Sequence, residues 1–164
     1  MGFIKNLLNK FKKDSESAKE IKVETTYNKQ LIENFKHDHQ ELLKIFGEIQ
    51  ESFKSDNNAH KKVVNLLNDF KIALEIHLMI EDNKLYSYLG EKYGSDDIHK
   101  AFVEDIQAEM TNIAKEVMFF IRKYTNRQSY DNNIDNFLSD LDNIGEVLVR
   151  RIKMEEEKLY ALYV

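Results

Sequence analysis

The chain has 164 residues, enough for one domain with a sizeable core, and a net charge of -5 at pH 7, with no cysteine, no proline, no tryptophan and only 5 glycines. Without cysteine it forms no disulfide, thiolate site or iron-sulfur cluster, so any metal must bind to histidine and carboxylate. The composition favours long helices over a turn-rich β protein, and the acidic balance argues against nucleic acid as a partner.

Residues 1–13 differ from the rest of the chain. Four lysines accompany apolar residues at helical spacing: Phe3, Ile4, Leu7, Leu8 and Phe11. The pattern predicts a short basic amphipathic helix, which either contacts an anionic membrane or a partner groove, or docks on the domain or stays unfolded. Residues 14–30 are polar and predict a linker. No apolar run approaches the roughly 18 residues of a transmembrane helix, so we expect a cytoplasmic protein that is at most peripheral to a membrane.

Four apolar stripes with helical spacing follow, separated by polar loops. The stripes cover residues 35–53, 63–88, 102–124 and 137–162, and the loops cover 55–58, 90–97 and 125–132. Short loops make consecutive helices antiparallel. We therefore predict an all-α fold over residues 31–164, an up-down-up-down four-helix bundle, with the N-terminal amphipathic helix as an addition.

Polar residues interrupt these stripes at one level of the predicted bundle. They are His39 in the first helix, His77 and Glu81 in the second, Glu109 on the flank of the third, and Arg151 and Glu155 in the fourth. At 1.5 Å per residue, His39 and His77 each lie roughly 20 Å from their shared loop and face each other. The segment from His77 to Tyr86 also resembles the one from Arg151 to Tyr160. Such a layer either holds a metal or forms a buried ion-pair network.

Three segments of the chain resemble one known family. They are Asp38-His39, the stretch from His77 to Tyr86, and the stretch from Arg151 to Tyr160. This combination is similar to the hemerythrin-like (HHE cation-binding) domain over about residues 30–164. The resemblance implies a four-helix bundle that holds two non-haem irons with histidines and carboxylates.

The resemblance carries over at some ligand positions and not at others. The matching positions are His39, His77 and Glu81. The family's other histidines fall at Ile106, Met110 and Arg151. Glu155 or Glu156 stands for the family's final carboxylate.

These departures change the expected chemistry. Isoleucine and methionine do not ligate iron as imidazole does, and the guanidinium of Arg151 between Glu81 and Glu155 would satisfy both carboxylates without an ion. We therefore expect no tightly bound cofactor, and otherwise a single Fe, Zn or Mn ion. The candidate metal ligands are His39, His77, Glu81, Glu109 and Glu155, and the candidate ion-pair network joins Arg151 to Glu81 and Glu155.

Two functions follow from these alternatives. The first is a small intracellular hemerythrin-like domain that binds or senses metal or oxygen through an incomplete iron site. The second is a metal-free bundle that binds a protein partner, since residues 144–155 resemble the last helix of the regulator-of-sigma-D family, which implies a sigma factor as partner. No nucleophile stands beside a base and no glycine-rich loop cradles a phosphate, so we expect no enzymatic activity and no nucleic acid partner.

Overall fold

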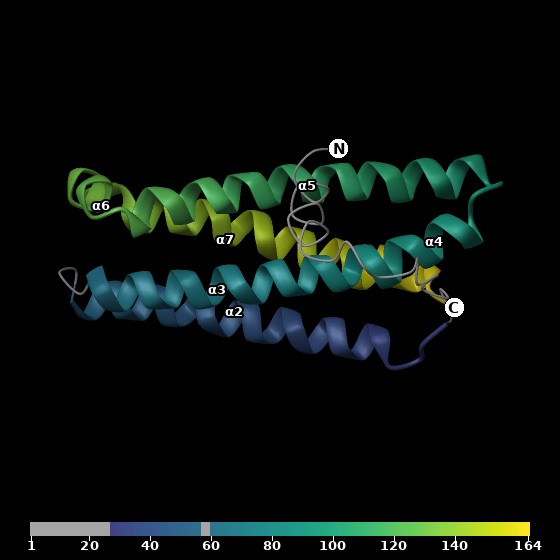
Figure 1. Ribbon diagram of the computed structural model, residues 1–164, viewed down its shortest axis with the longest axis horizontal. Coiled ribbons are helices and arrows are strands. Elements are labelled where there is room, and N and C mark those ends of the chain that lie inside the picture. Colours follow the sequence, from purple (N-terminus) through teal and green to yellow (C-terminus); the bar gives the residue numbers. More distant parts are fainter. Residues whose placement is uncertain (1–26, 57–59) are drawn as a thin grey trace, which may run out of the picture.

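The computed structural model describes residues 27–56 and 60–164, so the predicted helix at 1–13 and most of the predicted linker lie outside the described residues. The described part contains four long helices: α2 (Leu31–Ser55), α3 (His60–Ile80), α5 (Asp97–Thr125) and α7 (Phe137–Met154). They run along the long axis, and consecutive helices point in opposite directions (Figure 1). The prediction of an all-α, up-down-up-down bundle is confirmed. None of the described helices is long and apolar enough to cross a membrane.

Six shorter elements complete the described chain. They are η1 (Glu81–Tyr86), α4 (Ser87–Lys92), α6 (Arg127–Asn133), η2 (Ile134–Asn136), η3 (Glu155–Leu159) and η4 (Tyr160–Leu162). Of these, η1 and η3 are π-helical, with hydrogen bonds from residue i to residue i+5. Because η1 follows α3 directly and η3 follows α7 directly, the second and fourth long helices continue through a π turn.

The loops differ in detail from the prediction. The break expected at 125–132 contains α6, because the side chain of Asn126 accepts a hydrogen bond from the backbone N–H of Ser129 at 2.9 Å and caps a new helix. Tyr130 of α6 is buried, which anchors this short helix on the bundle. At the other end of α5, the Asp96 side chain caps the helix by accepting from two backbone N–H groups.

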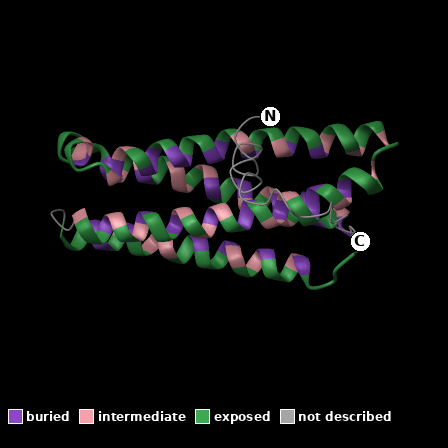
Figure 2. Cartoon of the chain, in the orientation of Figure 1, coloured by how far each residue is buried: buried purple, intermediate pink, exposed green. Residues whose placement is uncertain are grey.

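The core consists of two apolar clusters, one on each side of the polar layer. The cluster toward α6 includes Leu42, Leu74, Met110 and Leu148. The cluster toward the C-terminus includes Phe35, Leu85, Ile106 and Leu159. Buried positions follow the inward faces of all four long helices (Figure 2). The polar layer therefore lies between two apolar clusters along the bundle axis.

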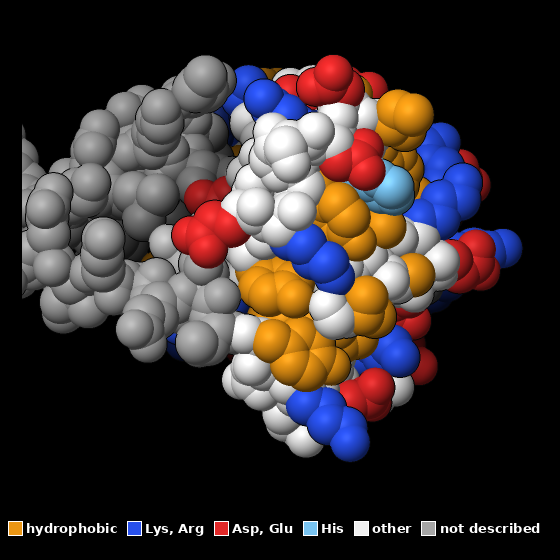
Figure 3. All heavy atoms as spheres, turned by 90° about the vertical axis from the view of Figure 1, so that its right-hand side faces the viewer, with side chains coloured by type: hydrophobic (Ala, Val, Ile, Leu, Met, Phe, Trp, Pro, Cys, Tyr) orange, Lys and Arg blue, Asp and Glu red, His pale blue; other side chains and the backbone are white. Residues whose placement is uncertain are grey.

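Aromatic side chains close the end of the bundle near the C-terminus. The rings of Tyr27 and Tyr163 stack with centroids 5.1 Å apart, and Tyr88 lies 4.6 Å from Tyr163. The Tyr163 hydroxyl accepts a hydrogen bond from the backbone N–H of Asn28 at 2.7 Å. Figure 3 looks at this end and shows apolar side chains gathered on the face, with basic and acidic side chains around them. These contacts tie the start of α2 to the end of the chain and so help to fix the register of α2 against α7.

Candidate metal centre

The two similar segments, 77–86 and 151–160, adopt the same local structure. In each, a glutamate begins a π-helical turn and a tyrosine lies five positions later. In an α-helix, the residue at i+5 lies roughly 140° around the axis from residue i, whereas the wider π turn brings it closer to the face of residue i. Glu81 and Glu155 are 1% and 2% exposed, and Tyr86 and Tyr160 are also buried. The π turns thus direct both glutamates and both tyrosines into the polar layer.

Each of these tyrosines bonds to the opposite segment. The Tyr86 hydroxyl accepts from a terminal nitrogen of Arg151 at 2.9 Å. The Tyr160 hydroxyl donates to Oε1 of Glu81 at 3.3 Å. Burial raises the pKa of both phenols, so both remain hydroxyl groups at neutral pH. The reciprocal bonds hold the second and fourth helices together at the level of the layer.

Arg151 is 3% exposed and makes three hydrogen bonds inside the core. Its Nε donates to Oε1 of Glu155 at 2.5 Å, Nη1 donates to the Ile106 carbonyl at 3.0 Å, and Nη2 donates to Tyr86. Burial opposes the charge on Arg151, but the neighbouring Glu155 carboxylate outweighs burial and raises the pKa of Arg151. Among the described residues, no ion pair joins Arg151 to Glu81. Of the two ion pairs expected for Arg151, the one with Glu155 is present. In place of the one with Glu81, Arg151 bonds to the Tyr86 hydroxyl.

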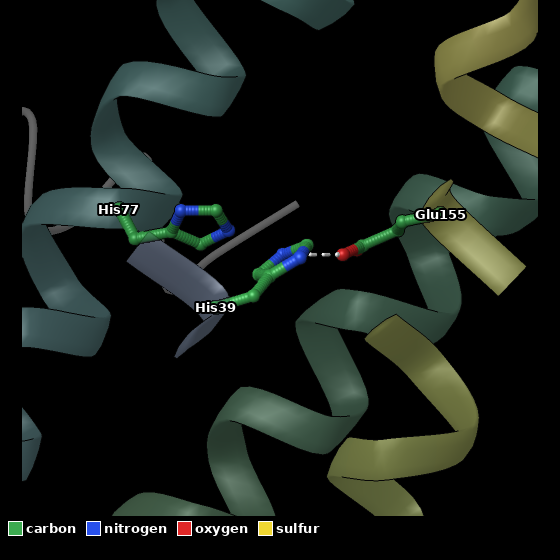
Figure 4. Close-up of side chains that lie close together, drawn as sticks. All are labelled: His39, His77 and Glu155. Carbon is green, nitrogen blue, oxygen red and sulfur yellow. Dashed lines mark ion pairs between the residues drawn. The ribbon is translucent and has the colours of Figure 1, made fainter. Parts of the chain in front are cut away.

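Two imidazoles lie beside Glu155. The rings of His39 and His77 have centroids 4.9 Å apart, which agrees with the depth counted from their loop. Nε2 of His39 is 3.2 Å from Oε2 of Glu155, and Nδ1 of His39 is 2.8 Å from Oε1 of Glu156. One ligand atom from each of His39, His77 and Glu155 lies within 4.8 Å of the others. Figure 4 shows these three side chains converging from three helices.

The two imidazoles differ in their affinity for protons. Burial lowers the pKa of His39, but hydrogen bonds to Glu155 and Glu156 outweigh it, so the net pKa is raised. Burial and the neighbouring His39 lower the pKa of His77. The Asp38 carboxylate lies 3.4 Å from Nδ1 of His77 and orients the ring. The ring nitrogen that does not contact Asp38 is Nε2. A neutral imidazole with one nitrogen so oriented is the form that binds metal.

Glu81 holds an unsatisfied polar atom. Its Oε1 accepts from Tyr160, but Oε2 is buried and has no hydrogen-bond partner among the described residues. Burial, with the negative charge of Glu155 as a second cause, raises the pKa of Glu81 well above its usual value. A buried carboxyl oxygen without a partner costs roughly 1 to 3 kcal/mol. A proton or a cation at this position would relieve that cost.

These donors suit one metal ion and do not suit two. Two imidazoles and one carboxylate form a donor set that first-row divalent metals bind, and the orphaned Glu81 oxygen adds a further carboxylate to the same layer. A second ion lacks ligands, because Ile106 and Met110 offer no imidazole and the guanidinium of Arg151 fills the fourth-helix position with a positive charge. A low local dielectric makes a second cation beside Arg151 unfavourable.

The predicted site residues separate into three groups. His39, His77 and Glu155 come together, and Glu81 lies in the same layer but is linked to His39 through the Tyr160 hydroxyl. The side chain of Glu109 is 53% exposed and lies 3.7 Å from Nη1 of Arg151, outside the His39, His77 and Glu155 group.

Reasoning from the stripes missed two carboxylates that touch the imidazoles. Asp38 contacts His77, and Glu156 contacts His39. Both precede or follow a core residue by one position, so the helical period places them on the flank of the stripe. The signal for them was an acid directly beside a buried histidine or glutamate in the sequence, in Asp38-His39 and Glu155-Glu156.

Comparison with known proteins identifies one family. The model of the hemerythrin HHE cation binding domain matches residues 30–163, which confirms the resemblance seen in the sequence. No curated protein and no solved structure matches the chain significantly.

Proposed function

Because the chain belongs to the hemerythrin HHE cation-binding domain family, we propose that it binds a single divalent transition-metal ion and acts as a metal-binding or metal-sensing domain. His39, His77 and Glu155 would hold the ion, with Glu81 as a fourth donor. The convergence of two buried imidazoles and a buried carboxylate within 4.8 Å is the observation that carries this proposal. Such a set accepts Fe(II), Zn(II) or Mn(II), and a bound ion would act as a Lewis acid with open coordination positions.

Arg151 has a defined part in this proposal. It provides a permanent positive charge at the position of a family histidine, and it already bonds to one oxygen of Glu155. The other Glu155 oxygen faces His39 and remains the metal-facing atom. The charge of Arg151 thus takes the electrostatic place of a second ion, which gives the site a stoichiometry of one.

A proton on His39 competes with the metal. His39 bonds to carboxylates through both ring nitrogens, which favours its protonated form, and a metal must displace the proton from the nitrogen that it binds. Zinc affinity should therefore fall by about tenfold per pH unit below the raised pKa of His39.

The test is a metal titration with a matched pair of variants. Protein purified without nickel resin is stripped, titrated with Zn²⁺ or Fe²⁺ and assayed for metal. We expect one ion per chain in the parent and in His37→Gln, which changes an exposed histidine of the same helix, and loss of binding in His39→Gln. Two ions per chain, or full binding by His39→Gln, would contradict the proposal.

A second candidate function rests on the same network without metal. The hydrogen bonds of Arg151 to Glu155, Ile106 and Tyr86, with His39 against Glu155, form an ion-pair network that needs no ion. In that case the domain is a structural module for a protein partner. Absence of metal from the isolated protein and unchanged stability on adding Zn²⁺ would favour this candidate. For either candidate we propose a binding role.

A further inference from the structure

A cavity of about 350 Å³ adjoins the polar layer. It lies between α2, α3 and α7, and Met110 of α5 also lines it. At one end are His39, His77, Glu155 and Arg151. Farther along the same helices, at the other end, are Phe46, Phe70 and Asp142. Two further lining residues, Val149 and Leu43, are 53% and 39% exposed. The cavity thus connects the candidate metal ligands with the surface.

The walls of the cavity are apolar between these two ends. Phe46, Phe70, Leu74 and Leu148 are among the side chains that form them. Gly145 makes room for the Phe46 ring, since a Cβ at this position would lie 2.9 Å from two of its atoms. An occupant of this space must have an apolar body, because the described wall between the ends offers no charged side chain.

The size of the cavity exceeds what a diatomic gas needs. At ~30 Å³ for each water-sized group, 350 Å³ holds on the order of ten non-hydrogen atoms. The volume also falls within the range of pockets for small organic ligands, roughly 300 to 1,000 Å³.

The charges at the two ends select the orientation of the occupant. Asp142 and Glu146 are exposed acids at the outer end. Arg151 is the only lysine or arginine among the described lining residues, and it lies at the inner end. With one divalent ion beside it, Arg151 and the ion carry three positive charges against the two negative charges of Glu155 and Glu81. The other acids that contact the layer, Asp38, Glu109 and Glu156, have side chains that are 34% to 53% exposed, so water screens their charge. An anionic group is therefore repelled at the mouth and attracted at the layer.

We propose that the cavity binds a medium-chain organic acid, with its carboxylate at the metal end and its apolar chain between α2 and α7. This proposal rests on the proposed function, because the metal supplies part of the positive charge at the inner end. The apolar chain contributes binding energy through burial, and the charged end sets the specificity.

The test uses octanoate, a medium-chain acid of about this size, and calorimetry on the full chain. Zinc alone is titrated first, which tests the metal site separately. Octanoate should then bind the zinc-loaded protein at least tenfold more tightly than octylammonium does, and at least tenfold more tightly than it binds the metal-free protein. Val149→Trp, which adds bulk at an exposed residue that lines the cavity, should weaken octanoate binding at least tenfold. Ile72→Trp is the matched control, because Ile72 is 55% exposed on α3 and does not line the cavity.

Each result has a clear consequence. If zinc binds but octanoate does not, or if octylammonium binds equally well, the ligand proposal fails and the metal proposal stands. If zinc does not bind, both fail. Unchanged octanoate affinity in Val149→Trp would place the ligand elsewhere and overturn the proposal.

Discussion

Replacement of Arg151 by alanine tests the polar layer most directly. The change removes a buried cation that bonds to Glu155, to the Ile106 carbonyl and to Tyr86. Glu155 is 2% exposed, so it stays buried and loses its strongest partner. Breaking a buried pair in this way costs roughly 3 to 5 kcal/mol of the free energy of unfolding. With a urea m value of about 2 kcal/mol per molar, the unfolding midpoint should fall by roughly 1.5 to 2.5 M.

The pH dependence distinguishes electrostatic loss from a simple cavity. In the parent, His39 and Arg151 outweigh burial and lower the pKa of Glu155, so this group contributes stability above its unfolded pKa of about 4.3 and loses it as the pH falls through the folded value. Without Arg151 the folded pKa of Glu155 rises relative to the parent. The difference in stability between variant and parent should therefore narrow as the pH falls from neutral through about 4.3 toward the lowered folded pKa of Glu155 in the parent.

Urea unfolding followed by circular dichroism, at several pH values, measures both effects. Arg150→Ala is the matched control, since Arg150 carries the same charge on the neighbouring, exposed position, and its effect should stay within about 0.5 kcal/mol. If Arg151→Ala were as stable as the parent, with the same pH dependence, the assignment of a buried ion pair to the layer would be refuted.

Three further changes probe the bundle, the layer and the N-terminal segment. Leu74→Asp places an unpaired carboxylate in the larger apolar cluster and should cost several kcal/mol, with loss of the helical circular dichroism signal, whereas a fully folded variant would contradict the assigned core. Arg151→His restores an imidazole at the family position and should raise iron or zinc affinity in a metal titration, and weaker binding would show that a side chain at position 151 does not reach the other ligands. Deletion of residues 1–13, which lie outside the described structure, should abolish weak, salt-sensitive binding to anionic vesicles in a sedimentation assay and leave the unfolding temperature nearly unchanged. A large loss of stability would instead mean that the segment packs on the bundle.

The sequence by itself determined the four-helix bundle and the depth of its polar layer. The helical period of apolar residues assigned an inward face to each helix, and short loops made consecutive helices antiparallel. A constant rise of 1.5 Å per residue then converted sequence distance into height. For this reason His39 and His77 could be paired from the sequence, and their rings do lie 4.9 Å apart. The rise and period of a helix depend only on its own backbone, so the height and face of each helical residue follow from its position in the sequence.

The tertiary structure decided how the polar side chains pair. A period of 3.6 residues places Tyr86 and Tyr160 away from Glu81 and Glu155, and the π turns bring each pair together in the core. Because of these turns, the Tyr86 hydroxyl accepts a hydrogen bond from Arg151. Glu81 bonds to Tyr160 instead of the guanidinium.

The same dependence on tertiary contacts explains Glu109 and Glu156. Both flank an apolar stripe, and the sequence favoured Glu109 as a metal ligand. In the structure Glu109 is half exposed, while Glu156 reaches Nδ1 of His39 across the interface of α2 with the end of the fourth helix. A flank position reaches the core only when the neighbouring helix leaves room for its side chain, and the packing of one helix against another is set by all the contacts between them. The helical period therefore fixes which residues can enter the layer, and the packing of the four helices fixes which of them bond.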